Sequence, residues 1–280
     1  MNIALRVVAP QTRELRFWSA LLIVAFRILL PLPLREVRMR SIRITLRTPG
    51  HITLPISYNR YLHGLLYECW RERFPGLHDM RGADGKGFRP FVFGRLEGAT
   101  RADGSTKTMH LNGLVSFEVR SYVEELIEEV AIRLSTCGTA RLGRHELEVA
   151  NIQTNDRLLF GARMAVRMRS PVVAYSVLDN GHTTPLSPLD PAWLPIVRGN
   201  AARKACELGL EVDKQLQAIA LEDGLRKQVT RFDNTMVTGW MGTLILAADP
   251  ELLALLWCCG FGEKSSQGFG LFDVDDGVRL

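Results

Sequence analysis

The chain has 280 residues, of which 46% are hydrophobic and 23% charged, and its formal net charge is +5 at pH 7; this suits about two domains with real hydrophobic cores and excludes a disordered chain. Its five cysteines are irregularly spaced and include no Cys-x-x-Cys pair, which argues against a disulfide framework and against a structural zinc site. We therefore expect a cytoplasmic protein without a metal or another cofactor.

The first 38 residues differ in composition from the rest of the chain. They carry six arginines against two acidic residues and hold most of the basic excess. Residues 17–34 are almost all apolar, as in a signal peptide or a weak membrane span, but Arg27 interrupts them after about ten residues, fewer than a bilayer crossing needs. We expect residues 1–38 to be a leader: either the working protein begins at Met39, or the leader forms a loosely attached amphipathic helix. We do not expect a membrane protein.

Residues 40–154 predict one α+β unit. Apolar and polar residues alternate in its first segment, which indicates a half-buried strand, and two later segments carry the apolar stripe of an amphipathic helix. The expected elements are a strand over 40–47, a helix over 58–73, an extended piece over 88–96, a strand over 108–118, a helix with its stripe from Val119 to Leu134, and a strand over 145–153. Their order, strand, helix, strand, strand, helix, strand, is that of a ferredoxin-like (RRM-like) unit.

The second half of the chain repeats this order less regularly. The expected elements are a strand over 163–169, a helix over 191–210 after a proline-rich loop, strands over 214–221, 226–232 and 236–247, a short helix over 250–258 capped by Asp249, and a strand over 268–274. The fold class is therefore α+β, with two tandem ferredoxin-like domains, each βαββαβ. We place the N-terminal domain at residues 39–154 and the C-terminal domain at 155–280, with the boundary near Gln153–Arg157.

Two Gly-Phe-Gly triplets, at residues 260–262 and 268–270, lie near the C-terminus. A polar turn that contains Lys264 lies between them. Glycine lets a backbone approach a ligand closely and point several N–H groups at a phosphate. A tight connection between a helix and a strand would explain one such triplet, but the doubled triplet favours a loop that binds a backbone. The residues expected to bind are Gly260, Gly262, Lys264, Ser265, Gly268 and Gly270.

The doubled Gly-Phe-Gly element after a short C-terminal helix resembles the glycine-rich loop of the CRISPR repeat-processing endoribonucleases, a family of the RAMP superfamily. Residues 58–67 are similar to that family's first helix, and the segments 77–79 and 89–93 provide a third similarity. The resemblance covers about residues 40–275. It implies tandem ferredoxin-like domains, CRISPR repeat RNA as the partner, and cleavage that leaves a 5′-hydroxyl and a 2′,3′-cyclic phosphate. It also implies that the protein can join a multi-subunit guide-RNA effector complex.

Cleavage of RNA without a metal requires a base for the 2′-hydroxyl proton, an acid for the leaving 5′ oxygen, and a cation for the charge that develops on the phosphate. His78 lies in a polar loop after the first helix and is the expected proton carrier, where the resemblance places the family's catalytic histidine. Tyr67 matches the family's active-site tyrosine. Arg89 matches the position of its catalytic lysine, and Lys86 could serve instead. His63 is the reserve histidine.

RNA binding is also expected from arginines that point outward from two strands. These are Arg43, Arg47, Arg163, Arg167 and Arg169, and each alone is more often just part of a solvated face. Arg203 and Lys204 are weaker candidates. His51, His110, His145 and His182 show no partner pattern and are interpreted as structural or surface residues. A catalytically inactive RNA-binding protein of the same fold is the alternative function. For the nuclease, the glycine-rich loop and at least one of His78 and His63 should share one side of the molecule.

Overall fold

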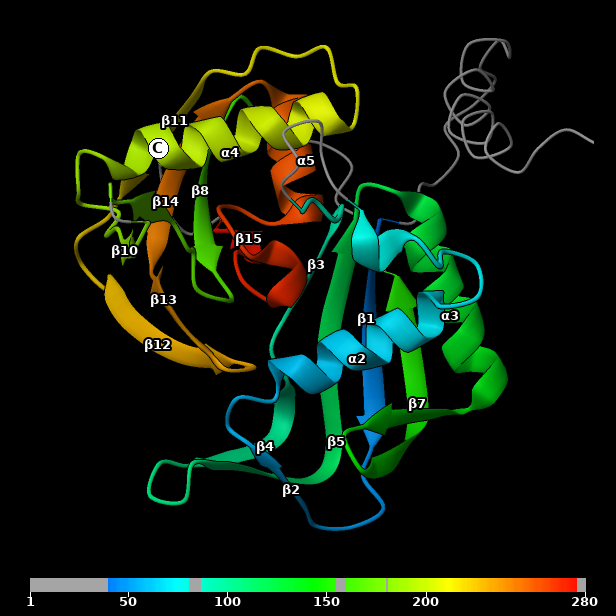
Figure 1. Ribbon diagram of the computed structural model, residues 1–280. Coiled ribbons are helices and arrows are strands. Elements are labelled where there is room, and N and C mark those ends of the chain that lie inside the picture. The colour runs from blue at the N-terminus through cyan, green and yellow to red at the C-terminus, as the bar shows by residue number, and fades with distance from the viewer. Residues whose placement is uncertain (1–39, 81–86, 155–159, 180, 276–280) are drawn as a thin grey trace, which may run out of the picture. The chain divides into compact units, whose positions relative to one another are not determined.

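The computed structural model describes residues 40–80, 87–154, 160–179 and 181–275 (Figure 1). These residues form two α+β units with separate hydrophobic cores, and both have the ferredoxin-like topology expected from the sequence. The leader over residues 1–38 and Lys86 lie outside the described residues. Within the described part of the chain, no helix is both long and apolar enough to cross a bilayer.

In its described residues, the first unit contains one antiparallel sheet of seven strands and two helices. Its elements are β1 (Ser41–Arg47), β2 (Ile52–Pro55), α2 (Asn59–Trp70), the 3-10 turn η1 (Leu77–Asp79), β3 (Phe91–Phe93), β4 (Glu97–Asp103), β5 (Thr108–Ser121), α3 (Glu124–Cys137), β6 (Thr139–Leu142) and β7 (His145–Thr154). The central order is β7-β1-β5, and β3 and β4 pair with the other edge of β5. This is the strand order of a ferredoxin-like unit, to which β6 and β2 are additions.

Helices α2 and α3 cover one face of this sheet (Figure 1). The alternation predicted for β1 is confirmed, because Ile42, Ile44 and Leu46 are fully buried against the helices. Trp70 at the end of α2 is also fully buried, and its indole Nε1 donates to the carbonyl oxygen of Leu126 in α3 at 2.8 Å. One face of the sheet therefore forms the core, and the other is free of these two helices.

The predicted start of the second helix was wrong. Residues 119–121 belong to β5, where Val119 and Arg120 pair with the first residues of β1. The apolar residues at these positions fit a helical stripe, but the backbone pairing with β1 decides their conformation. Strand β4 was also missed, because most of its residues are exposed on both faces and the alternation that signals a strand is absent.

The second unit repeats the topology. Its elements are β8 (Arg163–Met168), β9 (Tyr175–Val177), β10 (Thr183–Pro185), α4 (Trp193–Glu207), β11 (Leu216–Ala220), β12 (Arg226–Phe232), β13 (Thr235–Met241), β14 (Thr243–Ala248), α5 (Pro250–Cys259), η2 (Ser265–Gln267) and β15 (Phe272–Val274). The order β15-β8-β14-β11 corresponds to β7-β1-β5-β4 of the first unit.

An inserted hairpin distinguishes the second unit. Strands β12 and β13 pair with each other in a separate two-stranded sheet, and an isolated bridge joins Trp240 of β13 to Val172. The single strand predicted over 236–247 is therefore two strands in different sheets, divided at Gly242, where a Cβ would lie 3.2 Å from the Cα of Leu225. The last strand begins at Phe272 rather than at residue 268, because the preceding residues belong to the glycine-rich loop.

Candidate active site

Helix α2 and the turn η1 bring together three of the predicted catalytic residues. His63 and Tyr67 are four residues apart on α2 and therefore share a face, with ring centroids 4.5 Å apart. Tyr67 also meets His78 of η1, edge to face, with ring centroids 5.3 Å apart. Tyr67 thus contacts both imidazole rings.

Arg89 holds His78 in place through the backbone. Its Nη2 donates to the carbonyl oxygen of His78, and Leu77 is buried in the core beside it. The His78 side chain itself is 69% exposed, and its Nδ1 lies 3.1 Å from Oδ1 of Asp79. A fixed backbone with an accessible imidazole suits a group that must exchange a proton with a ligand.

The two α2 residues of the cluster have shifted pKa values. Burial lowers the pKa of His63 to about 4, and the nearby His78, Arg89 and Arg60 add to this effect because they disfavour a further positive charge. Burial raises the pKa of Tyr67 above its usual value, and the Arg89 guanidinium partly opposes the increase. At neutral pH, His63 is therefore uncharged and Tyr67 keeps its proton.

The tip of the β12–β13 hairpin packs against this cluster from the second unit. The Phe232 ring meets His63 edge to face, with centroids 5.6 Å apart, and Oδ1 of Asp233 lies 2.6 Å from Nη1 of Arg60. Asp233 has a φ of 52°, and its carbonyl oxygen accepts from Nε of Arg231 at 2.9 Å. Phe232 and Asp233 were not predicted as site residues, although strands were predicted on both sides of their turn.

The glycines of the C-terminal loop serve the packing of the protein itself. Gly260, Gly262, Gly268 and Gly270 all have positive φ, between 77° and 88°. A Cβ at Gly262 would lie 2.5 Å from the carbonyl oxygen of Val173, and one at Gly270 would overlap the backbone of Phe261. The turn between the triplets presents the partly exposed side chains of Glu263, Lys264, Ser266 and Gln267.

Lys204 of α4 fixes this loop from inside. It is 3% exposed, and its Nζ donates to the carbonyl oxygens of Gly260 at 2.5 Å and Gly262 at 2.9 Å and to Oγ of Ser265 at 3.0 Å. Burial lowers its pKa to about 7. Lys204 was expected to contact RNA as a weaker candidate. Its ammonium group is instead buried and bonded inside the protein, so that it cannot reach a ligand at the surface.

The loop adjoins the helix that carries His63 and Tyr67. Nδ2 of Asn59, at the start of α2, donates to the carbonyl oxygen of Gln267 at 3.1 Å. A Cβ at Gly268 would lie 2.6 Å from the Phe93 ring. The glycine-rich loop and the histidine-bearing helix are thus in contact.

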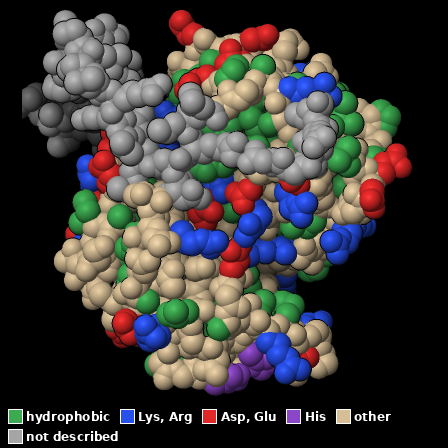
Figure 2. Space-filling model, turned by 180° about the vertical axis from the view of Figure 1, so that it is seen from behind, with side chains coloured by type: hydrophobic (Ala, Val, Ile, Leu, Met, Phe, Trp, Pro, Cys, Tyr) green, Lys and Arg blue, Asp and Glu red, His purple; other side chains and the backbone are tan. Residues whose placement is uncertain are grey.

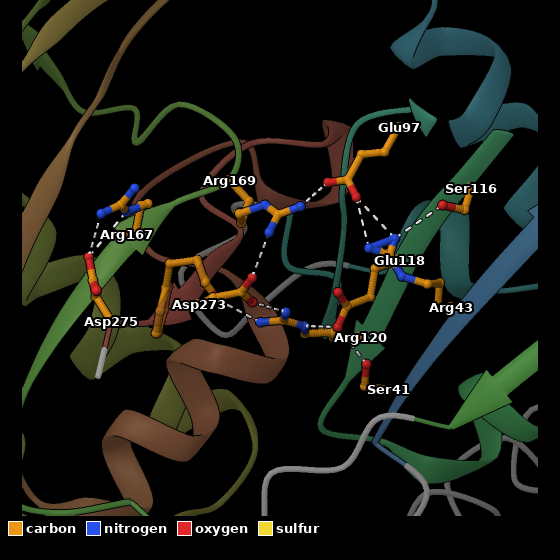
Figure 3. Close-up of polar contacts among 11 residues, drawn as sticks. Ser41, Arg43, Glu97, Ser116, Glu118, Arg120, Arg167, Arg169, Asp273 and Asp275 are labelled. Atoms are coloured by element: carbon orange, nitrogen blue, oxygen red, sulfur yellow. Dashed lines mark hydrogen bonds and ion pairs between the residues drawn. The ribbon is translucent and has the colours of Figure 1, made fainter. Parts of the chain in front are cut away.

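Arg43 of β1 and Arg169, which follows β8, take part in ion pairs, and the pair between Arg169 and Glu97 joins the two units (Figure 3). Arg43 and Arg169 both pair with Glu97, and Arg169 also pairs with Asp273 at 3.1 Å. Arg120 is fully buried and lies 2.5 Å from Asp273 and 2.6 Å from Glu118. We call these six residues the inter-unit network.

The other arginines lie outside this network. Arg47 pairs with Glu148 at 3.4 Å, and Arg167 pairs with Asp275 at 2.9 Å. Arg163 is exposed on β8. Binding of RNA by any of these arginines stays a prediction. Among the residues that the structure describes, no group of three or more His, Cys, Asp or Glu is placed to hold a metal ion.

Comparisons with known proteins agree with this arrangement. Residues 153–274 match the family model described as CRISPR associated protein Cas6, C-terminal. No curated protein matches the sequence. A Cas6-related protein of Pyrococcus furiosus has the same fold, with a TM-score of 0.74, 18% identity, and coverage of 85% of this chain and 99% of that one.

Two further solved structures share the fold. A RAMP protein described as binding different RNA substrates has a TM-score of 0.72 and 18% identity, over 85% of this chain and all of that one (100%). A Cas6 product complex has a TM-score of 0.60 and 17% identity, over 84% of this chain and 99% of that one. These structures share with the chain the fold of two tandem ferredoxin-like units. Residues 153–274, which make up most of the C-terminal domain, match the Cas6 C-terminal family model, in agreement with the resemblance found in the sequence.

Proposed function

We propose that this protein is a metal-independent endoribonuclease that cleaves CRISPR repeat RNA. The observation that carries the proposal is the contact of Tyr67 with the imidazoles of both His63 and His78, with Arg89 beside them. This cluster supplies two proton carriers and a fixed cation on a helix that contacts the glycine-rich loop. The match to the Cas6 C-terminal family supports the choice of substrate.

The proposed reaction is an internal transfer at one phosphate. The 2′ oxygen attacks the adjacent phosphorus, the bond between the 2′ oxygen and phosphorus forms, and the bond between phosphorus and the 5′ oxygen breaks. The 2′-hydroxyl gives its proton to a base, and the leaving 5′ oxygen takes a proton from an acid. The products are a 2′,3′-cyclic phosphate and a 5′-hydroxyl. The entering and leaving oxygens lie on opposite sides of the phosphorus, so that two proton carriers on two sides suit the geometry.

We assign the acid to His78 and the base to His63. The exposed imidazole of His78 can reach a bound 5′ oxygen, and histidine exchanges protons near neutral pH. His63 is uncharged above about pH 4, so that it is available to accept a proton throughout the neutral range. Each carrier typically contributes about 10²–10⁴-fold to the rate.

Arg89 and Tyr67 would act on the phosphate. A guanidinium keeps its charge at every working pH and stabilises the negative charge of the transition state rather than donating a proton. The Tyr67 hydroxyl keeps its proton because its pKa is raised, so that it can donate a hydrogen bond to a phosphate oxygen. Lys86 remains a second candidate for the cation.

RNA would reach this cluster along the glycine-rich loop. The polar turn with Lys264 and Ser265 contacts the start of α2 through Asn59 and Gln267, so that a strand bound on the loop would pass close to His63. Two proteins of this fold, at 18% and 17% identity, were solved as an RNA-binding RAMP protein and as a product complex, which supports an RNA ligand. After cleavage, the product-bound protein could join a guide-RNA effector complex.

Incubation with repeat RNA in the presence of EDTA tests the proposal. We expect cleavage at one position, a 2′,3′-cyclic phosphate on the upstream fragment, and no cleavage of an RNA with a single 2′-deoxy nucleotide at that position. Binding of both RNAs without cleavage of either would favour the alternative, an inactive repeat-binding protein.

A further inference from the structure

Two histidines outside the proposed active site form a stacked pair on the first unit. The rings of His51, which follows β1, and His110 of β5 have centroids 5.1 Å apart and an angle of 26° between their planes. The sequence analysis interpreted both as structural or surface residues. Neither takes part in the chemistry proposed above, and His51 is exposed.

The His110 ring is held at both nitrogens. Its Nδ1 lies 3.3 Å from Oγ1 of Thr53 on β2, and its Nε2 lies 3.2 Å from Oγ1 of Thr108 on its own strand. With both nitrogens engaged, the ring cannot turn freely, and its flat face is what it offers to a neighbour. The exposed His51 ring stacks on one face of the His110 ring, and the two rings together form a flat aromatic platform.

The pair lies on the face of the sheet opposite the helices. Leu111 is buried in the core beneath α2 and α3, so that its neighbours His110 and Asn112 point to the other face. Arg101 of β4 is the direct cross-strand partner of His110 and is exposed. Figure 2 shows histidine side chains together at the lower end of this view, with Lys or Arg side chains beside them.

A cavity of about 820 Å³ opens at this place. It is lined by His51, His110, Asn112 and residues 98–104 of β4 and the turn that follows it, among them Arg101 and Asp103. The Asp103 carboxylate accepts hydrogen bonds from the backbone N–H and the hydroxyl of Ser105. The cavity therefore combines a flat aromatic platform, a guanidinium, an amide and a carboxylate that is engaged within its own turn.

We propose that this cavity binds one unpaired nucleotide of the RNA substrate. The base stacks on the His51–His110 pair, the phosphate pairs with Arg101, and the Asn112 amide bonds to the edge of the base. Proteins bind unpaired bases in this way, with aromatic or histidine rings for stacking and cations for the backbone. That the ligand is RNA rests on the function proposed above; the stacked pair and its cavity do not.

The test compares the affinity of the full-length protein for repeat RNA between variants, measured by fluorescence anisotropy. We expect His51→Ala to weaken binding about tenfold, which lies within the range measured for loss of one stacking contact. His51→Trp keeps a flat ring and should bind as tightly as the wild type. Arg101→Ala should lower the slope of log affinity against log salt by about one. The control is His182→Ala, a histidine far along the chain from this cavity.

Each outcome decides the proposal. The proposal is supported if His51→Ala binds repeat RNA more weakly than the wild type and His51→Trp binds it as tightly. Affinity of His51→Ala within twofold of the wild type overturns it, and so does a His51→Trp variant that binds as weakly as the alanine variant, because the role would then be structural. If the wild type binds repeat RNA through this pair but does not cleave it, only the nuclease fails. If the wild type cleaves and His51→Ala binds normally, only this site fails.

Discussion

At the scale of single residues, the site depends on side chains whose protonation is set by burial. His63 and Lys204 both have pKa values lowered by desolvation, to about 4 and about 7. In His63 this fixes a neutral imidazole beside Tyr67. In Lys204 it accompanies a set of hydrogen bonds that determine the shape of the glycine-rich loop.

The pH dependence of cleavage tests the assignment of His63. If His63 is the base, the rate rises with pH through about 4, where the imidazole loses its proton. His63→Ala should remove this acid limb and slow single-turnover cleavage about 10²-fold or more. An unchanged profile in His63→Ala would assign the 2′ proton to another group, and Tyr67→Phe would then be the variant to examine.

The hydrogen bonds of Lys204 to the glycine-rich loop contribute to the stability of the folded protein. Lys204→Met removes the donor to three carbonyl oxygens and to the Ser265 hydroxyl, and we expect it to lower the free energy of unfolding at pH 7 by about 1–3 kcal/mol. The folded-state pKa of about 7 is below the usual value of 10.5, so that between these values the unfolded chain binds more protons. The wild type therefore gains stability from pH 7 to pH 10. Urea titrations should show the difference from Lys204→Met widening over this interval; a constant difference would contradict the assignment.

At the scale of elements, the hairpin β12–β13 completes the site from the second unit. Its tip places Phe232 against His63 and neutralises Arg60 with Asp233. The ring of Phe232 shields one side of His63 from water, and burial is the main cause of the low pKa of that imidazole.

Phe232→Ala should therefore move the acid limb of the cleavage profile to higher pH, toward the ordinary histidine value of about 6.5. Val229→Ala, a change at an exposed residue on the same strand, should leave the limb where it is. The readout is the pH at half-maximal single-turnover rate. If Phe232→Ala and Val229→Ala give the same pH as the wild type, the hairpin does not set the protonation of His63.

Elements with a clear period could be predicted almost to the residue, and contacts between distant elements could not. The alternation in β1 and the capping Asp249 of α5 are local signals and were sufficient. Strand β4 has no such period, and the start of α3 depends on pairing between β5 and β1. The contact between Arg60 and Asp233 joins residues 173 positions apart, and nothing in either segment alone indicates it.

At the scale of the whole described chain, the inter-unit network joins the sheets of the two units. Arg169, which was expected to contact RNA, shares the Asp273 carboxylate with the fully buried Arg120 (Figure 3). Outward direction on a strand could be predicted, but the carboxylates that come from another part of the chain could not. The network holds three arginines and three acidic residues, so that its charges balance.

Asp273→Asn should weaken this junction, because it removes a carboxylate from both Arg120 and Arg169. We expect a loss of about 1–3 kcal/mol in the free energy of unfolding, less than for a fully buried pair because Asp273 is partly exposed. Asp275→Asn is the matched control: it affects the exposed Arg167 and should cost about 0–1 kcal/mol. Equal urea midpoints for the two variants would show that the network does not stabilise the junction.

The central claim is that an imidazole on η1 transfers a proton during cleavage. It is tested most directly by His78→Ala, with repeat RNA in EDTA, by measuring single-turnover cleavage and affinity on the same samples. We expect the cleavage rate to fall by about 10²-fold or more. The affinity for RNA should stay within about twofold of the wild type, because the His78 side chain is exposed and Arg89 holds the backbone at this position. Cleavage by His78→Ala at the wild-type rate would contradict it.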